Sequence, residues 1–116
     1  MGEHNDDYHD LLEQQRFLEK IERGIRIANR EIIHNLIPSV NKETILAFAV
    51  AIGRLRARYL KAAFDLGVNE NGEAPERAEV EELKTRREMY EEARSAFEAL
   101  REAVERGYLD VGDLEG

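Results

Sequence analysis

The chain has 116 residues, of which 36% are charged, and its formal net charge at pH 7 is -8. This length is typical of one domain with a thin core. The chain contains no cysteine, which excludes a disulfide framework, a thiolate zinc site and a cysteine nucleophile. Only two prolines are present, and Ala, Glu, Leu and Arg dominate, so we predict an all-α fold.

The longest apolar run extends from Ile45 to Gly53. It is much shorter than the roughly 20 residues that a membrane-spanning helix needs. The first ten residues, MGEHNDDYHD, lack the basic and then apolar layout of a signal peptide. We therefore expect a cytoplasmic protein without a membrane segment.

The first predicted helix covers residues 7–36, and its apolar seam follows a heptad rhythm with two polar positions. The seam consists of Leu11, Gln14, Leu18, Ile21, Ile25, Ala28, Ile32 and Asn35. Residues 1–7 are polar and are expected to fray, with Asn5 or Asp6 available as the N-cap. Pro38 should end the helix, because the residue before a proline is disfavoured in the α region.

The second predicted helix covers residues 42–66 and contains the run TILAFAVAIG, with Asn41 as its N-cap. Helical steps of three and four define a core seam of Ile45, Phe48, Ile52, Leu55, Tyr59, Ala62 and Leu66. A second stripe beside it consists of Leu46, Val50, Gly53, Ala57, Leu60 and Phe64. This helix should be buried over a broad face, as the middle helix of a bundle is.

Residues 67–74 (GVNENGEA) give a strong turn signal. Gly67 suits the left-handed position after a helix, and Pro75 suits the first turn of the next. The third predicted helix covers residues 75–106 and should end at Gly107. Its stripe consists of Val80, Leu83, Tyr90, Phe97, Leu100 and Val104, with Arg87 and Arg94 beside it.

Two short connections between long helices predict an up-down-up antiparallel three-helix bundle over residues 1–107, followed by a tail at 108–116. If the first hairpin turns near residue 38, partners in the first two helices have numbers that sum to about 77. Close helix packing is then predicted where small residues meet, at the pairs Gly24 with Gly53 and Ala28 with Ala49.

The second hairpin should place partners whose numbers sum to about 142. Phe48 would then lie near Ala93, and Tyr59 near Leu83. In this arrangement the third helix ends beside the first turn. The lengths of the three helices are therefore consistent with a single bundle.

Glu31 and His34 form an E-x-x-H pair on one helical face. Ferritin-like di-iron bundles use such pairs together with carboxylates on facing helices. The pattern is incomplete, because the second helix offers only Glu43 and Asp65, near its two ends. An iron or zinc site at Glu31 and His34 is one hypothesis. The alternative is a histidine that interacts with the helix C-terminus and binds no ligand.

The sequence offers little for enzymatic catalysis. Its two serines and two threonines lie in no nucleophile motif, and there is no glycine-rich phosphate loop. Arg54, Arg58 and Lys61 form a basic stripe that could bind nucleic acid, although the acidic net charge disfavours this. We expect instead that such basic residues pair with carboxylates of the third helix or of a second subunit.

The tail has apolar residues at Tyr108, Leu109, Val111 and Leu114 among Asp, Glu and Gly. It either folds back over the bundle end, covering Ala47, Ala51 or Ile37, or docks on a partner as a short linear motif. Residues 109–114 resemble the L-x-V-G-x-L core of the C-terminal peptides that load cargo into encapsulin shells. The resemblance covers six residues, with Asp and Glu where small and basic residues are usual.

Apolar residues outside the main seams exceed the need of a thin three-helix core, which indicates an interface. The predicted interface residues are Phe17, Ile27, Leu46, Ala47, Val50, Ala51, Leu60 and Phe64. The first hypothesis is therefore a non-enzymatic, homodimeric protein that recognises a protein partner through a helix face, with no cofactor. The metal-binding bundle and the nucleic-acid-binding regulator are the alternatives.

Overall fold

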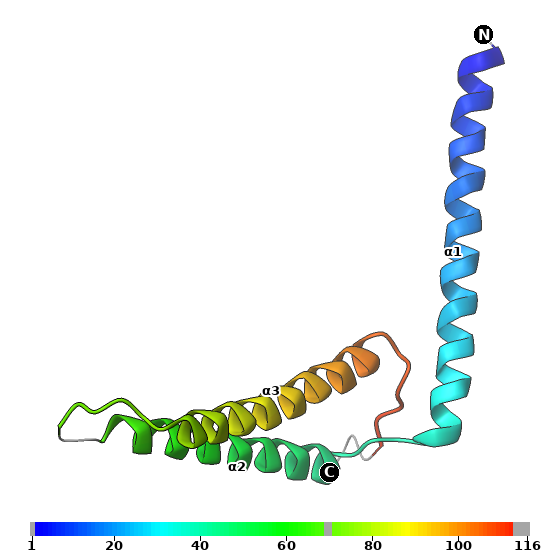
Figure 1. Ribbon diagram of the computed structural model, residues 1–116. Helices are drawn as coiled ribbons and strands as arrows, with labels where there is room; N and C mark the ends of the chain where they lie inside the picture. Colours follow the sequence, from blue (N-terminus) through cyan, green and yellow to red (C-terminus); the bar gives the residue numbers. More distant parts are fainter. Residues whose placement is uncertain (1, 69–70, 113–116) are drawn as a thin grey trace.

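The computed structural model describes residues 2–68 and 71–112, and residues 2–5 by their backbone alone. Three helices follow one another along the chain: α1 (Gly2–Leu36), α2 (Lys42–Gly67) and α3 (Arg77–Glu105). Within the described ranges there is no β-strand, so the all-α, three-helix prediction is confirmed. The chain is L-shaped, with α2 and α3 in one arm and α1 in the other (Figure 1).

α1 begins at Gly2, five residues before the predicted start at residue 7. No glycine or proline interrupts residues 3–7, and carboxylates near a helix N-terminus interact favourably with its dipole. The helix ends at Leu36, two residues before Pro38, as predicted. No helix in the described part of the chain has both the length and the hydrophobicity required to cross a membrane.

α2 begins as predicted, with Asn41 as its N-cap. The Asn41 Oδ1 atom accepts hydrogen bonds from the Thr44 backbone N–H at 2.9 Å and from the Thr44 hydroxyl at 2.8 Å. The other end differs from prediction, because Gly67 is the last helical residue and the left-handed backbone occurs at Gly72, with φ of 67°.

The start of α3 also differs from prediction. The helix begins at Arg77, two residues after Pro75, with Glu76 as its N-cap. The Glu79 carboxylate accepts a hydrogen bond from the Glu76 backbone N–H at 3.2 Å. This local bond satisfies an amide that would otherwise lack a partner, and it explains why the helix starts there.

α2 and α3 pack against each other through the predicted core seam of α2. All seven seam residues are half-buried or buried, while every other described side chain of α2 is exposed. Phe48 stacks on Phe97 with ring centroids 5.7 Å apart, and Tyr59 stacks on Tyr90 at 6.1 Å. The seam prediction for α2 is therefore confirmed.

The register of this pair is displaced by one to two helical turns from the prediction, which placed Phe48 near Ala93 and Tyr59 near Leu83. The two stacked aromatic pairs stabilise the observed register. Of the arginines beside the α3 stripe, Arg86 is half-buried and Arg87 is exposed. Arg94 is also exposed, but its guanidinium lies 5.9 Å from the ring centroid of Tyr90, so it contacts the stripe as predicted.

α1 contributes nothing to this packing, because α2 and α3 are the only helices in contact in the described structure. The antiparallel order of the predicted bundle is thus present for α2 and α3, and α1 stands apart. The radius of gyration is 24.0 Å, whereas a compact domain of this length has about 13 Å. Among the residues whose side chains are described, only Val40, Ile52 and Leu109 are buried apolar residues. A single chain therefore has almost no hydrophobic core.

Candidate interaction surface

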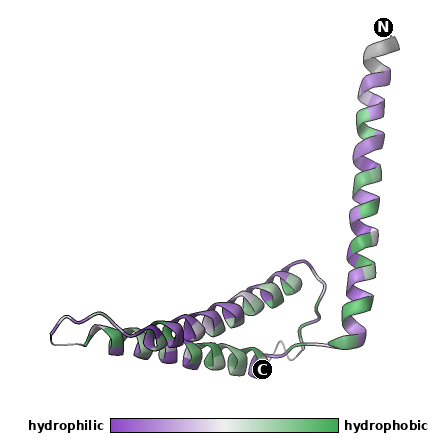
Figure 2. Cartoon of the chain, viewed as in Figure 1, coloured by the Kyte–Doolittle hydropathy of each residue, from purple (hydrophilic) through white to green (hydrophobic). Residues whose placement is uncertain are grey.

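The predicted seam of α1 faces solvent along its whole length. Figure 2 shows apolar residues recurring along this isolated helix. The exposed large apolar residues of α1 are Tyr8, Leu11, Phe17, Leu18, Ile21, Ile25, Ile27, Ile32 and Leu36. Monomeric proteins rarely expose continuous apolar patches of this extent, so the α1 seam is a candidate interface.

The outer face of α2, which we define as Leu46, Val50, Gly53, Leu60 and Phe64, is a second exposed apolar surface. Its large residues range from 52% to 66% exposure. It lies beside the core seam, on a side of α2 that does not contact α3. Every residue that the sequence predicted for an interface is exposed, including Phe17, Ile27, Ala47 and Ala51.

The predicted close packing at Gly24 with Gly53 and at Ala28 with Ala49 is not present within one chain, because α1 does not contact α2. A Cβ atom built on either glycine would meet nothing within 4 Å. A glycine inside a helix costs about 1 kcal/mol relative to alanine. Inside a single chain, neither glycine has a packing partner to offset that cost.

The corner of the L is built by the segment between α1 and α2 together with the tail. The Val40 backbone N–H donates to the Asp110 carbonyl at 2.8 Å, and the Gly112 N–H donates to the Val40 carbonyl at 2.8 Å. Val40 and Val111 thereby form an isolated parallel bridge. The described part of the tail, residues 108–112, therefore folds back onto the connection at Val40. It leaves Ala47, Ala51 and Ile37, the residues that it was predicted to cover, exposed.

The tail is directed to the corner by the end of α3. Gly107 adopts φ of 77°, and its N–H donates to the Val104 carbonyl at 3.0 Å. The Tyr108 N–H donates to the Ala103 carbonyl at 2.8 Å, which completes a Schellman motif. This turn sends Leu109 into the corner, where it is 5% exposed. Leu114, the fourth predicted docking residue, lies outside the described residues.

An apolar pocket of about 640 Å³ lies at the corner, between the first turn of α2, the last turns of α3 and the tail. Its apolar wall is made by Val40, Ile45, Phe97, Leu100, Val104 and Val111. Asn41, Lys42, Arg101 and Glu105 also line the pocket. Its apolar wall continues the apolar surface of the corner.

Glu31 and His34 do not assemble a metal centre in the described structure, where no group of three metal-ligating side chains comes together. His34 instead faces the tail, with its Nδ1 atom 3.6 Å from Asp110 Oδ2. Asp110 Oδ1 accepts a hydrogen bond from Arg30 Nη2 at 2.7 Å. Sequence reasoning missed Asp110 as a contact of α1, because 80 residues separate it from Arg30.

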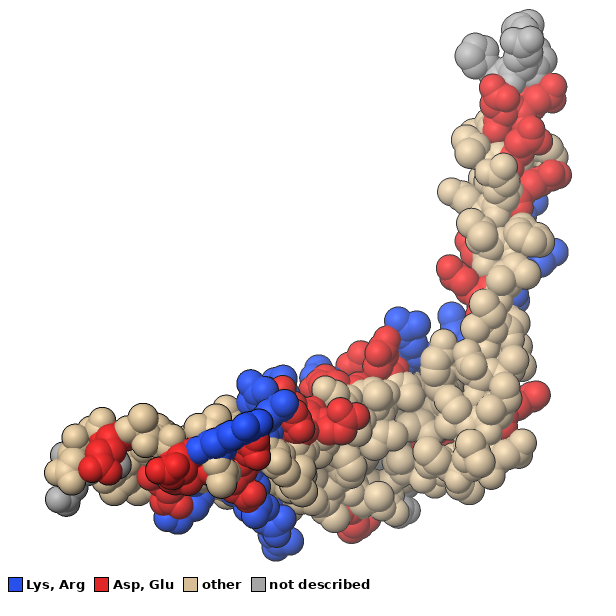
Figure 3. Space-filling view, in the orientation of Figure 1, with Lys and Arg blue, Asp and Glu red and all other residues tan. Residues whose placement is uncertain are grey.

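Ion pairs on the hairpin are local. Most described acidic residues of α3 that pair do so three or four residues away in the same helix, as Glu81 does with Arg77 at 3.0 Å. On α2, Lys61 pairs with Asp65 at 2.6 Å. Arg54, Arg58 and Lys61 therefore do not form the predicted ion pairs with α3 carboxylates among the described residues. Figure 3 shows basic and acidic side chains intermixed along the hairpin.

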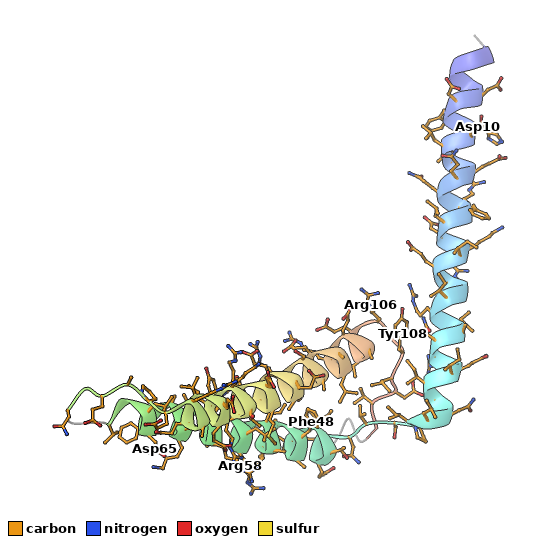
Figure 4. The ribbon with its side chains drawn as sticks, viewed as in Figure 1. Asp10, Phe48, Arg58, Asp65, Arg106 and Tyr108 are labelled. Carbon is orange, nitrogen blue, oxygen red and sulfur yellow. The ribbon has the colours of Figure 1, made fainter. Side chains whose placement is uncertain are left out.

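Arg54 and Arg58 form no ion pair with any described residue, and Arg58 extends away from the hairpin (Figure 4). At the other end of α3, Arg106 and Tyr108 lie close together beside the turn that leads to the corner. The side-chain hydrogen bond with Tyr108, and then the nearby Glu102 carboxylate, raise the pKa of the Arg106 guanidinium.

Comparison with protein-family models, curated proteins and solved structures finds no match. The features that bear on function are therefore those of the chain itself, namely a two-helix hairpin, an isolated long helix and two uncovered apolar faces.

Proposed function

We propose that this protein is a non-enzymatic helical protein that acts by protein-protein interaction, and that its first partner is a second copy of itself. The observation that carries the proposal is the isolation of α1, which leaves its apolar seam without any helix to pack on. Hydrophobic burial is the main favourable term in folding, so a seam of this length needs a partner.

The exposed area supports the same proposal. The chain exposes 9787 Å², which is about 3,300 Å² more than the roughly 6,500 Å² expected for a compact monomer of this size. Obligate homodimers bury about 2,000–5,000 Å² in total at their interfaces. The surplus on each chain is thus large enough to form such an interface.

The experiment is multi-angle light scattering on the purified protein over a hundredfold range of concentration, together with metal analysis. A metal-free species of twice the chain mass supports the proposal. A stable monomer throughout the range would contradict it. Stoichiometric iron or zinc would instead support the alternative centred on Glu31 and His34.

A further inference from the structure

We propose that the dimer forms by exchange of α1, so that each α1 packs along the outer face of the other chain's α2, in antiparallel order, with residue numbers that sum to about 77. This inference rests on the proposed self-association and specifies the surfaces that it uses. In the resulting assembly, α2 lies between its own α3 and the partner's α1.

The corner geometry makes this exchange possible. α1 ends at Leu36 and α2 begins at Lys42, so both helices extend outward from the same corner of the L (Figure 1). A two-fold axis that passes beside the corner, parallel to its bisector, lays the α1 of one chain alongside the α2 of the other. The end of one helix then lies beside the start of the other, which is the antiparallel order with a sum near 77.

The lengths of the two surfaces agree with this arrangement. At about 1.5 Å per residue, the 35 residues of α1 extend about 52 Å and the 26 residues of α2 about 39 Å. The seam of α1 therefore spans the whole outer face of α2. In this register Phe17 lies opposite Leu60, and both are exposed in the single chain. Both uncovered faces are buried by one event, which pairing of α1 with another α1 would not achieve.

The register also explains the two helical glycines. Gly24 comes opposite Gly53, and Ala28 opposite Ala49, so two levels of small side chains meet one turn apart. Their positions are open in the single chain, where a Cβ on either glycine would have no neighbour within 4 Å. Small residues allow two helix backbones to approach closely, which gives the glycines a packing role in the dimer.

One pair of opposite charges fits the antiparallel order. The sum of about 77 places Glu22 of one chain next to the level of Arg54 of the other. Neither side chain forms an ion pair with a described residue of its own chain.

The same junction opposes fold-back of α1 onto its own α2. Val40 is held between α1 and α2 by its two backbone hydrogen bonds to the tail, and Arg30 binds Asp110 from the α1 side. Reversal of the chain at this point would have to break these contacts and re-expose Leu109. A second copy can cover both faces without disturbing the corner.

The absence of cysteine in the chain allows a direct test by disulfide formation. Variants Ala28→Cys and Ala49→Cys are prepared separately, mixed, refolded together and oxidised. Exchange predicts a covalent dimer in the mixture that forms at least tenfold faster than in either variant alone, since a disulfide requires the two Cα atoms to lie within about 7 Å. The control is a mixture of Arg23→Cys with Ala49→Cys, in which the first thiol lies on the back of α1. This mixture should form no covalent dimer.

Several other results of this experiment would each overturn the exchange. A covalent dimer of Ala28→Cys alone would show that α1 packs on the partner's α1. A covalently closed monomer of the double variant Ala28→Cys/Ala49→Cys would show fold-back within one chain. Dimeric mass by light scattering without the mixed disulfide would overturn the exchange and leave self-association standing, whereas a monomeric mass would remove both proposals.

A charge-reversal series tests the register independently. Arg54→Glu should raise the dimer dissociation constant at least threefold, and adding Glu22→Arg to the same chain should restore it. Arg23→Glu, on the back of α1, is the matched control and should leave the dissociation constant unchanged. Equal weakening by the control and the interface variant, or failure of the combined variant to recover, would overturn the predicted register.

Discussion

Arg30 on α1 and Asp110 in the tail form an ion pair with 2.7 Å between Nη2 and Oδ1, although 80 residues separate them in the chain. The same carboxylate lies 3.6 Å from the His34 ring. With the two backbone hydrogen bonds at Val40, these contacts join the first helix, the connection and the tail. They set the direction in which α1 leaves the corner.

We expect Asp110→Asn to lower the free energy of unfolding by less than about 1 kcal/mol, because both partners are partly solvated and such pairs contribute little. The loss should shrink at high salt, which screens exposed charges. Urea unfolding followed by circular dichroism, at fixed protein concentration, measures both effects. Glu31→Gln, one position from Arg30, is the control and should cause no change. A loss as large in high salt as in low salt would contradict this account.

Phe97→Ala should destabilise the hairpin by about 2–3 kcal/mol, because it removes a stacked partner of Phe48 from a half-buried site. The midpoint of urea unfolding reports the change. Val68→Ala, at an exposed position after α2, should remain within about 0.5 kcal/mol of the wild-type protein. Similar values for the two variants would show that the aromatic stack does not hold the register.

Gly107→Ala should lower stability by about 1–2 kcal/mol, since a side chain is strained at φ of 77°. Gly67→Ala is the matched glycine substitution at a helical position, where a Cβ would meet nothing within 4 Å, and it should stabilise by up to about 1 kcal/mol. Thermal unfolding measured on both variants gives the comparison. Opposite signs are expected, and the same sign for both would contradict the Schellman turn at the end of α3.

Leu109→Ala should cost about 2–3 kcal/mol, because this side chain is 5% exposed at the corner. Val111→Ala, two residues further along and 41% exposed, should cost less than about 1 kcal/mol. Differential scanning calorimetry of the two variants separates a packed tail from a free docking peptide. If Leu109→Ala leaves the melting temperature unchanged, the tail does not stabilise the corner.

Local signals in the sequence were sufficient for the presence of the three helices and for the ends of α1 and α3 and the start of α2. Asn41 could be identified as an N-cap, Pro38 as a terminator and Gly107 as the end of the third helix, because each acts through its own backbone conformation or a neighbour three or four residues away. The core seam of α2 was also predictable, since helical periodicity alone determines which side chains share a face.

The sequence by itself therefore determined the fold class, the positions of the helices and the candidate faces. Only the tertiary structure decided the register of Phe48 on Phe97, the contact of Asp110 with Arg30 and the separation of α1 from α2. These depend on long-range packing, in which several registers bury similar apolar area and the choice is made by a few specific contacts. An apolar seam indicates that a partner helix is required, but it does not specify which chain provides that helix.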